Sequence, residues 1–474
     1  MSSSREHFSS RIGFILAAAG SAVGIGNLVG FPVNAAKNGG GAFLIMYALF
    51  VFLICLPVMI AEMAVGRNTE KEPVGAFKTL SQGSSLWGAA GFLGVLTPFM
   101  IAVFYMVITV WIFGYIGLTL TGNLDYLASG AGFGEFINSP YLFVALIAVA
   151  GIVSFILAAG VKDGIEKAAK TLMPALFAML IIMVIFVLTL DNAMAGVTFF
   201  LVPDFEKITA SVVNGALSQA FFSLSLGMGI LITYGSYINR QTNIPNSAKL
   251  VAITDTGVAF VAGLMILPAV FSFNPNVDPS ELSDSSVSLI FTFLPKIFLA
   301  LQTSLGYVGA SAVAAFFFIL VFFAAITSLV SIIEVPVSYL VTEKKQSRKK
   351  ALGYLSVTAG LLTLFAVASF GMVAFFTEFT SYGGGTKSFF DVVYDVFYDT
   401  ILPLNGFLVC IFVSYRWKKK QLSEELSIGN ENYKGSWVEK YINFSLGTFI
   451  PAIVLLIFIN TVAIKFFAYS PFGL

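Results

Sequence analysis

The chain has 474 residues, of which 58% are hydrophobic and only 11% are charged, and its mean hydropathy is +0.90. Ordinary soluble domains contain about 45–50% apolar and about 25% charged residues, so a soluble fold could not bury this much apolar surface. The 26 Lys and Arg residues nearly balance the 25 Asp and Glu residues, which argues against a basic face for nucleic acid. The composition therefore predicts an all-α integral membrane protein with many spans.

A helix needs about 20 apolar residues to cross the hydrocarbon core of a bilayer. Eleven continuous apolar stretches reach this length, and their continuity argues against the alternating pattern of a β-barrel. In chain order, spans 1 to 11 are residues 12–36, 41–66, 88–121, 141–160, 170–190, 211–238, 248–273, 305–341, 351–377, 389–415 and 442–468. The short connections leave no room for a separate soluble domain. Cys55 and Cys410 both lie in apolar runs, which argues against a disulfide framework or a zinc site.

The distribution of Lys and Arg predicts the orientation. With a cytoplasmic N-terminus, the great majority of the 26 Lys and Arg residues fall on the cytoplasmic side, as the positive-inside rule requires. The odd number of spans then places the C-terminus outside. We expect a multi-pass protein of the cell (inner) membrane.

Spans 1 and 6 are interrupted in their middle. Residues 20–27 read G-S-A-V-G-I-G-N, and residues 223–229 read S-L-S-L-G-M-G. Glycine costs about 1 kcal/mol inside a helix, and unwound backbone at membrane depth is tolerated only where it lines a cavity inside the protein. Close helix packing is the alternative role for these glycines. Two breaks in matching positions favour an inverted repeat of residues 12–190 and 211–415, with 442–468 as an added helix and a binding site between the breaks.

The broken ends indicate what such a site binds. The N-terminal end of a half-helix suits a carboxylate, and free carbonyls of Gly20, Ala22 and Val23 suit a hard cation such as Na⁺. Gly24 and Gly26 let a ligand approach the backbone closely. Together these features predict a zwitterionic amino acid bound beside an alkali ion.

Span 8 carries a polar stripe at helical spacing. Ala324, Thr327, Ser328 and Ser331 follow the i, i+3, i+4, i+7 pattern and so share one helix face. Their hydroxyls could complete an oxygen cage for Na⁺, or they could bond back to carbonyls of their own helix. The presence of the break in span 1 favours the cage.

Acidic residues inside the membrane are costly and need a partner, a proton or an ion. Asp255, early in span 7, is interpreted as functional. For Glu62 and Glu334 we predict structural hydrogen bonds to nearby backbone or to Arg67. His7, the single histidine, precedes span 1 and is expected to be solvated, without a catalytic role. With no nucleophile–histidine pair or metal cluster at membrane depth, an enzyme is not expected.

Several motifs resemble the neurotransmitter:sodium symporter family, in its bacterial, LeuT-like amino-acid branch. They are R-I-G-F-I-L-A-A-A-G-S-A-V-G-I-G-N at 11–27, F-P at 31–32, N-G-G-G-A-F at 38–43, E-M-A-V-G-R at 62–67, Q-A-F-F-S-L-S-L-G-M-G at 219–229, T-Y-G-S-Y at 233–237 and F-F-A-A-I-T-S at 322–328. The resemblance covers nearly the whole chain. It implies about 11 transmembrane helices in the LeuT-like 5+5 inverted repeat, and sodium-coupled import by alternating access.

The resemblance also implies two sodium sites and a substrate site. The first sodium site would comprise the Ala22 carbonyl, Asn27, Ser223, Asp255 and the substrate carboxylate. The second would comprise carbonyls of Gly20, Val23 and Ala324 and hydroxyls of Thr327 and Ser328. The substrate carboxylate would meet the amides of Ile25 and Gly26 and the hydroxyl of Tyr105, with Ala22, Gly24 and Ser223 adjacent. The substrate side chain would lie among Ile101, Phe222, Ser225, Met228, Ser328 and Ile332.

Gates are implied on both sides of this site. The outer gate would comprise Tyr105, Phe222 and Asp395; the inner gate would comprise Arg5, Tyr237 and Glu343. Val29-Gly30 stands where the family usually has Trp-Arg, so we predict that Asp395 is unpaired or protonated and that aromatic residues close the outer side. Asp391 remains an alternative to Asp395 because the alignment is uncertain by a residue. On the inner side, the usual aspartate aligns with Thr342, and Glu343 is the proposed substitute.

Gly24 replaces the aspartate of amine-transporting relatives, and the pocket is apolar with an adaptable Met228. We therefore predict a neutral, hydrophobic L-amino acid as the substrate, two Na⁺ ions, and a monomer or homodimer in the lipid bilayer. The Asp255 carboxylate could do the work of chloride in chloride-dependent relatives, which predicts chloride-independent transport. The alternatives are a proton-coupled or uncoupled carrier of the same fold, and an amino-acid-binding channel or receptor.

Overall fold

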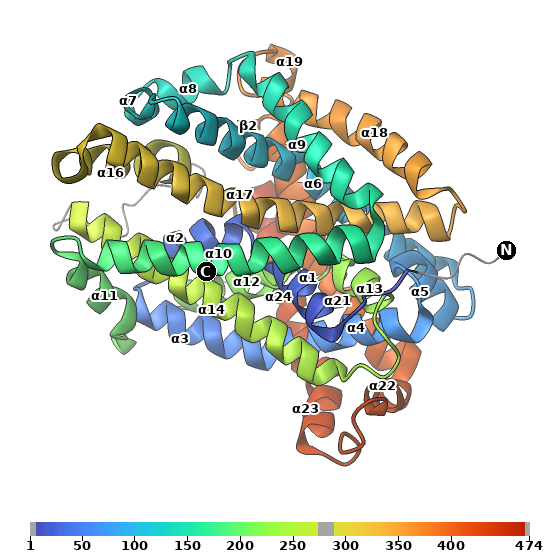
Figure 1. The fold of residues 1–474 in the computed structure, drawn as a ribbon. Helices are drawn as coiled ribbons and strands as arrows, with labels where there is room; N and C mark the ends of the chain where they lie inside the picture. Colours follow the sequence, from blue (N-terminus) through green and yellow to red (C-terminus); the bar gives the residue numbers. More distant parts are fainter. Residues whose placement is uncertain (1–5, 274–288, 470–474) are drawn as a thin grey trace.

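The computed structural model describes residues 6–273 and 289–469 of the chain. Within these residues, nine helices are long and apolar enough to cross a membrane, and a tenth span is a pair of helices bent by 55°. The bent pair is span 1, built from α1 (Arg11–Ala22), the π-helix η1 (Gly26–Gly30) and α2 (Phe31–Lys37). Span 6 is also divided, into α12 (Ala210–Ser223) and α13 (Ile230–Gly235). The predicted multi-span helical fold is confirmed, and the chain is broken at both predicted places (Figure 1).

The other spans follow in chain order. They are α3 (Gly41–Phe50), η2 (Val51–Cys55) and α4 (Leu56–Thr69) for span 2; α6 (Ser85–Leu120) for span 3; α9 (Tyr141–Ala158) for span 4; η3 (Val161–Glu166) and α10 (Lys167–Leu188) for span 5; α14 (Ile244–Phe273) for span 7; α17 (Gln302–Thr342) for span 8; α18 (Arg348–Ala368) for span 9; α20 (Phe389–Val393), η7 (Tyr394–Ile401), α21 (Leu402–Ile411) and η8 (Phe412–Lys418) for span 10; and α23 (Trp437–Leu446) and α24 (Phe449–Phe467) for span 11.

The connections contain more structure than the sequence suggested. They hold the short helices α5 (Pro73–Leu80), α7 (Leu124–Ala128), α8 (Gly132–Phe136), α11 (Ala193–Leu201), η4 (Phe205–Lys207), η6 (Leu289–Phe293), α16 (Leu294–Ala300), α19 (Ala374–Thr377) and α22 (Lys419–Ser427), and a hairpin of β1 (Thr380–Tyr382) and β2 (Gly385–Lys387). Span 9 was predicted too long. Its helix ends at Ala368, and Gly371, with φ of 98°, turns the chain before α19.

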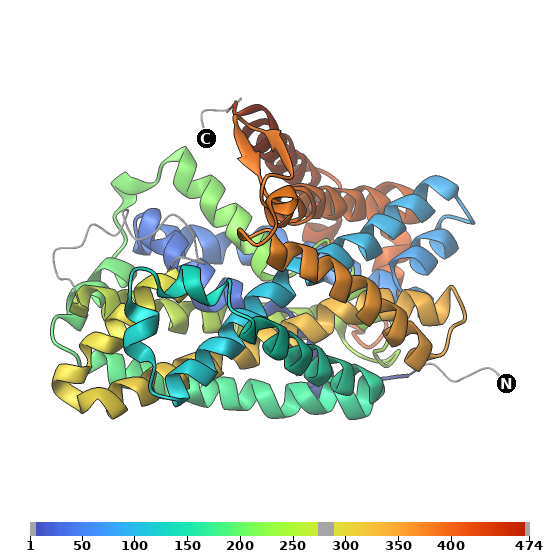
Figure 2. The ribbon, with the colours of Figure 1, turned by 90° about the horizontal axis from the view of Figure 1, so that it is seen from above.

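Helix α1 occupies the centre of the bundle. It contacts α10, α14 and α17, and Figure 1 shows these longer helices crossing the molecule around it. Residues 17–22 of α1 are all buried, and they are alanine, glycine and serine, so neighbouring helices can approach closely. Spans 10 and 11 lie together at one edge, seen in orange and red in Figure 2.

Each break has a local cause. Helix α1 ends at Ala22 because the next residue, Val23, is extended with ψ of 100°, and Pro32 lies in the first turn of α2. In span 6, Gly227 and Gly229 take φ of 76° and 67°, which glycine adopts without steric cost, and Ser225 takes φ of 54°. The freed peptide groups of Gly227 find side-chain partners: its N–H donates to Glu62 Oε1 at 2.8 Å, and its carbonyl accepts from Asn405 Nδ2 at 3.0 Å. The unwound chain is therefore hydrogen-bonded inside the protein, as membrane depth requires.

Candidate functional site

A buried polar cluster joins the two breaks. It consists of Asn27, Tyr47, Ser223 and Asp255, one residue each from spans 1, 2, 6 and 7. The Asp255 carboxylate accepts hydrogen bonds from Asn27 Nδ2 at 2.7 Å, from Ser223 Oγ at 2.9 Å and from Tyr47 Oη at 3.2 Å. A buried carboxylate is tolerated only with such partners.

Three of the four cluster residues are those predicted for the first sodium site. Asn27 is oriented by both ends of its amide: Oδ1 accepts from the Gly24 N–H at 3.2 Å, and Nδ2 donates to Ser223 and Asp255. The sequence reasoning missed Tyr47. It could have been found as the single tyrosine in the apolar run of span 2. A buried tyrosine hydroxyl usually has a hydrogen-bond partner, so this residue pointed to other polar groups nearby.

A second set of oxygens lies where span 8 meets span 1. Ser328 Oγ is 3.2 Å from each of the carbonyl oxygens of Gly20, Ser21 and Val23. Thr327 Oγ1 instead bonds back to its own helix, at 3.0 Å from the Ala324 carbonyl. Thr327 therefore bonds back to its own helix, whereas the Ser328 hydroxyl reaches carbonyls of span 1.

Two residues of this region differ from the prediction. The Ser21 carbonyl, which was not predicted, accepts from Ser225 Oγ at 3.1 Å as well as from Ser328. Among the described residues, Ser331 makes no hydrogen bond to span 1: its hydroxyl donates to the Thr327 carbonyl and accepts from Tyr234 Oη at 2.7 Å. Ser331 is thus part of helix packing between spans 6 and 8.

The backbone between the two oxygen sets faces span 3. The Ile25 N–H donates to Tyr105 Oη at 3.3 Å. A methyl group added at Gly24 would lie 2.7 Å from Tyr105 Oη and 2.8 Å from Ser328 Oγ, so it would displace one or both of these hydroxyls. A methyl group at Gly26 would meet no atom within 4 Å. Open space therefore adjoins the Gly26 backbone, where the substrate carboxylate was predicted to bind.

The remaining predicted substrate contacts are also inside the protein. Ile101 on α6, Ile332 on α17 and Met228 in the break of span 6 are 1%, 3% and 5% exposed, respectively. They come from three different spans, as expected for a pocket lined by several helices.

An aromatic cluster surrounds Phe222, a residue of the predicted outer gate. The ring of Phe222 stacks on Tyr398 of span 10, with centroids 4.9 Å apart and planes at 29°. Phe104 of span 3 packs edge-on against Tyr398 at 5.7 Å and Tyr394 at 5.1 Å. The sequence analysis did not predict Phe104, Tyr394 or Tyr398. The chain has 49 Phe and 17 Tyr residues, and nothing in the sequence around these three sets them apart from the others.

The prediction that Asp395 is unpaired is wrong. Lys465 Nζ of span 11 lies 2.8 Å from Asp395 Oδ1, and Tyr382 Oη donates to Asp395 Oδ2 at 2.9 Å. Position 30 is glycine where the family usually has an arginine, and a lysine of span 11 provides the positive charge beside Asp395. Asp391, the alternative, is exposed and closes a capping box with Ser388 at the start of α20, which is a structural role.

At the predicted inner gate, Tyr237 Oη donates to Glu334 Oε1 at 2.8 Å, and Arg348 pairs with both oxygens of Glu334. Glu343 lies beside α5, where its Oε1 would be 2.7 Å from a methyl group at Gly75. Arg5 lies outside the described residues. His7 is exposed, with Nδ1 at 3.3 Å from the Tyr237 carbonyl.

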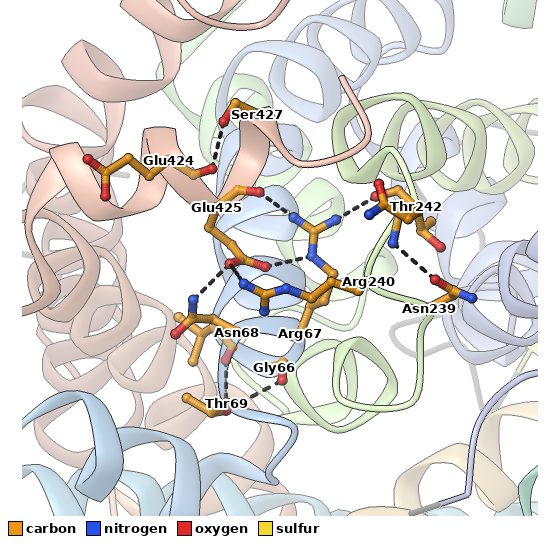
Figure 3. A network of polar contacts seen from close by, with 12 residues as sticks. Gly66, Arg67, Asn68, Thr69, Asn239, Arg240, Thr242, Glu424, Glu425 and Ser427 are labelled. Atoms are coloured by element: carbon orange, nitrogen blue, oxygen red, sulfur yellow. Dashed lines mark hydrogen bonds and ion pairs between the residues drawn. The ribbon is translucent and has the colours of Figure 1, made fainter. Parts of the chain in front are cut away.

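Of the two partners considered for Glu62, backbone or Arg67, the structure shows the backbone. Glu62 bonds to the unwound chain at Gly227, and Arg67 is instead bound by Glu425 of α22, with Nε 2.6 Å from Oε1. Figure 3 shows this network, in which Asn68 and Arg240 bind the same carboxylate. It joins the end of span 2, the connection between spans 6 and 7, and α22. This pairing could not be predicted, because Arg67 and Glu425 are more than 350 positions apart in the chain.

Comparisons with known proteins agree with this architecture. A model of the Sodium:neurotransmitter symporter family matches residues 5–135 and 135–472. An uncharacterized sodium-dependent transporter, YhdH, of Bacillus subtilis (strain 168) is 35% identical over 473 residues, covering 97% of this chain and 98% of the relative. The human sodium- and chloride-dependent GABA transporter 2 is 25% identical, covering 87% of this chain and 77% of the relative.

The fold matches that of a solved structure. The crystal structure of MhsT in complex with L-phenylalanine superposes with a TM-score of 0.82 at 38% identity, covering 96% of this chain and 99% of MhsT. The chain therefore belongs to the sodium:neurotransmitter symporter family and is a multi-span, sodium-dependent membrane transporter.

Proposed function

We propose that this protein carries a neutral, hydrophobic L-amino acid into the cell together with two Na⁺ ions, without a need for chloride. The observation that supports it most is the convergence of two separate oxygen sets on one broken helix. The polar cluster meets the break from spans 2, 6 and 7, and Ser328 meets it from span 8.

The chemistry of each set suits its proposed ion. The polar cluster carries the negative charge of Asp255 and, with the Ala22 carbonyl, would hold Na⁺ next to the substrate carboxylate. Carbonyls of Gly20 and Val23 with the Ser328 hydroxyl are neutral oxygens, which suit a second Na⁺. An ion bound there would tie span 1 to span 8, and its release would free the two spans to separate.

The proposal of a hydrophobic amino acid is supported by the residues around the break. Gly24 carries no acid that could pair with an amine, and Ile101, Met228 and Ile332 are apolar and buried. MhsT, a relative of the same fold, was crystallised with L-phenylalanine. In the proposed arrangement, residues 12–190 and 211–415 form the two repeats, the N-terminus is cytoplasmic and the C-terminus lies outside.

Uptake into proteoliposomes tests the substrate and the driving ion. We expect labelled leucine, phenylalanine or tryptophan to accumulate under an inward Na⁺ gradient and not when K⁺ replaces Na⁺. A proton-coupled carrier would respond to a pH gradient instead, and a receptor would show no counterflow. Uptake restricted to glycine or GABA would contradict the proposed pocket.

Chloride independence is proposed from Asp255. A carboxylate among the donors of the polar cluster supplies the negative charge that a bound chloride would otherwise supply. Replacing chloride by gluconate should leave uptake by the wild-type protein unchanged. Asp255→Asn should lose uptake in gluconate and regain part of it in chloride, whereas Asp204→Asn, at an exposed position, should behave as wild type in both. An Asp255→Asn variant as active as wild type in gluconate would contradict the proposal.

A further inference from the structure

The π-helical segment η7 of span 10 presents two chemically different sets of side chains. Tyr398 stacks on Phe222, and Tyr394 packs against Phe104 and Tyr398. Asp395 and Asp399, from the same segment, contact Lys465 of span 11. One short segment therefore joins the aromatic roof over the break in span 6 to an ionic cluster at span 11.

The ionic cluster depends on one lysine. Lys465 Nζ lies 2.8 Å from Asp395 Oδ1 and 2.7 Å from Asp399 Oδ2. The two carboxylate side chains are only 6% and 14% exposed, so water compensates their charge poorly. Lys387 is 4.0 Å from Asp395 and does not contact Asp399 within the same limit. Without Lys465, two nearly buried carboxylates a turn apart would repel each other.

Further contacts fix this cluster to span 11. Tyr382 Oη donates to Asp395 Oδ2, and the ring of Tyr382 packs on Phe466 at 4.9 Å. The Gly383 N–H donates to the Phe466 carbonyl at 3.2 Å. Thr400 Oγ1 donates to the Asp395 carbonyl at 2.7 Å, across the wide turn of the π-helix. Such turns are uncommon and are frequently found at functional sites.

We propose that Lys465 is a positioning residue for the substrate site: by holding Asp395 and Asp399, it sets the register of η7 that places Tyr398 over Phe222. Lys465 touches neither the polar cluster nor the oxygens around Ser328. Its loss should therefore loosen the roof over the substrate and leave the sodium oxygens in place. This inference rests on the proposed function for its transport readout, but the geometry of the roof can be tested separately.

The first experiment measures the half-saturation concentrations of substrate and Na⁺ for uptake. Lys465→Met should raise the KM for phenylalanine roughly three- to tenfold, the effect of losing one aromatic pair. The Na⁺ half-saturation should stay within about twofold, since the sodium oxygens are untouched. Lys465→Arg should recover most of the lost affinity. Lys207→Met is the matched control and should behave as wild type. The side chain of Lys207 is 56% exposed and lies 3.8 Å from one carboxylate.

A double-mutant cycle tests whether the lysine acts through the tyrosine. Tyr398→Ala removes the stack, so adding Lys465→Met to it should raise the KM little further. If the KM of the double variant rises by the product of the two single increases, Lys465 acts independently of the roof and the proposal is overturned. An equal shift in Na⁺ half-saturation, or no recovery with arginine, would overturn it as well.

A labelling experiment separates this proposal from the proposed function. Ser225→Cys places a thiol in the break of span 6, and the native Cys55 and Cys410 are buried. A membrane-impermeant maleimide should label this thiol faster when Lys465→Met is added, and equal labelling rates would overturn the role of Lys465. If no amino acid is transported by the wild-type protein but the labelling rates differ, the proposed function fails and the role of Lys465 stands.

Discussion

Replacing Ser328 by alanine removes the one side-chain hydroxyl that reaches from span 8 to three carbonyls of the broken span 1. Each of those contacts is 3.2 Å long, to Gly20, Ser21 and Val23. The added space is small, because serine and alanine differ by a single oxygen. The variant therefore tests the second sodium site with little change in packing.

The size of the effect follows from the lost ligand. A hydrogen bond or polar contact to a charged group contributes about 1.5–3 kcal/mol, and each 1.4 kcal/mol corresponds to a tenfold change in affinity. The Na⁺ half-saturation for uptake should rise roughly 10- to 150-fold. Since Na⁺ and substrate are coupled, the apparent substrate affinity at a fixed, limiting Na⁺ concentration should fall too.

The assay is uptake of labelled phenylalanine across a series of Na⁺ concentrations at constant ionic strength. Ser338→Ala is the matched control, because Ser338 lies on the same helix, is buried, and its hydroxyl has no hydrogen-bond partner among the described residues. An unchanged Na⁺ dependence in Ser328→Ala, or an equal change in Ser338→Ala, would refute the assignment of this site.

Other predictions use further pairs of matched positions. Gly24→Ala should abolish uptake, because its methyl group would collide with Tyr105 and Ser328. Gly26→Ala should fold normally and raise the substrate KM, because its methyl group would occupy open space. An equal loss of uptake in the two variants would contradict this reasoning. Glu425→Gln should lower the free energy of unfolding by about 3–5 kcal/mol, because it leaves buried Arg67 without a full countercharge. Exposed Glu424→Gln should change the melting temperature little in the same thermal-shift assay.

The sequence predicted most reliably what depends on local chemistry. Breaks in spans 1 and 6 follow from glycines that cost helix stability, and the structure interrupts both spans there. The i, i+3, i+4 spacing on span 8 correctly grouped Thr327 and Ser328. It could not tell which hydroxyl turns toward span 1, because that depends on how two helices are rotated against each other.

Long-range pairing was the main source of error. Asp395 was expected to lack a partner because the arginine at span 1 is missing, but Lys465, 70 residues further along the chain, takes that place. Arg67 was one of two partners considered for Glu62, but Glu62 bonds to backbone and Arg67 pairs with Glu425. Charges in a membrane protein must be compensated, yet the chain order does not reveal which distant helix provides the opposite charge.

We propose that the broken middles of spans 1 and 6 hold Na⁺ and an amino acid together. Equilibrium binding of labelled phenylalanine to the purified protein, in NaCl and in KCl of equal concentration, tests it most directly. We expect saturable binding in NaCl, at most weak binding in KCl, and an affinity that rises with Na⁺ concentration. Equal affinity in the two salts would contradict it.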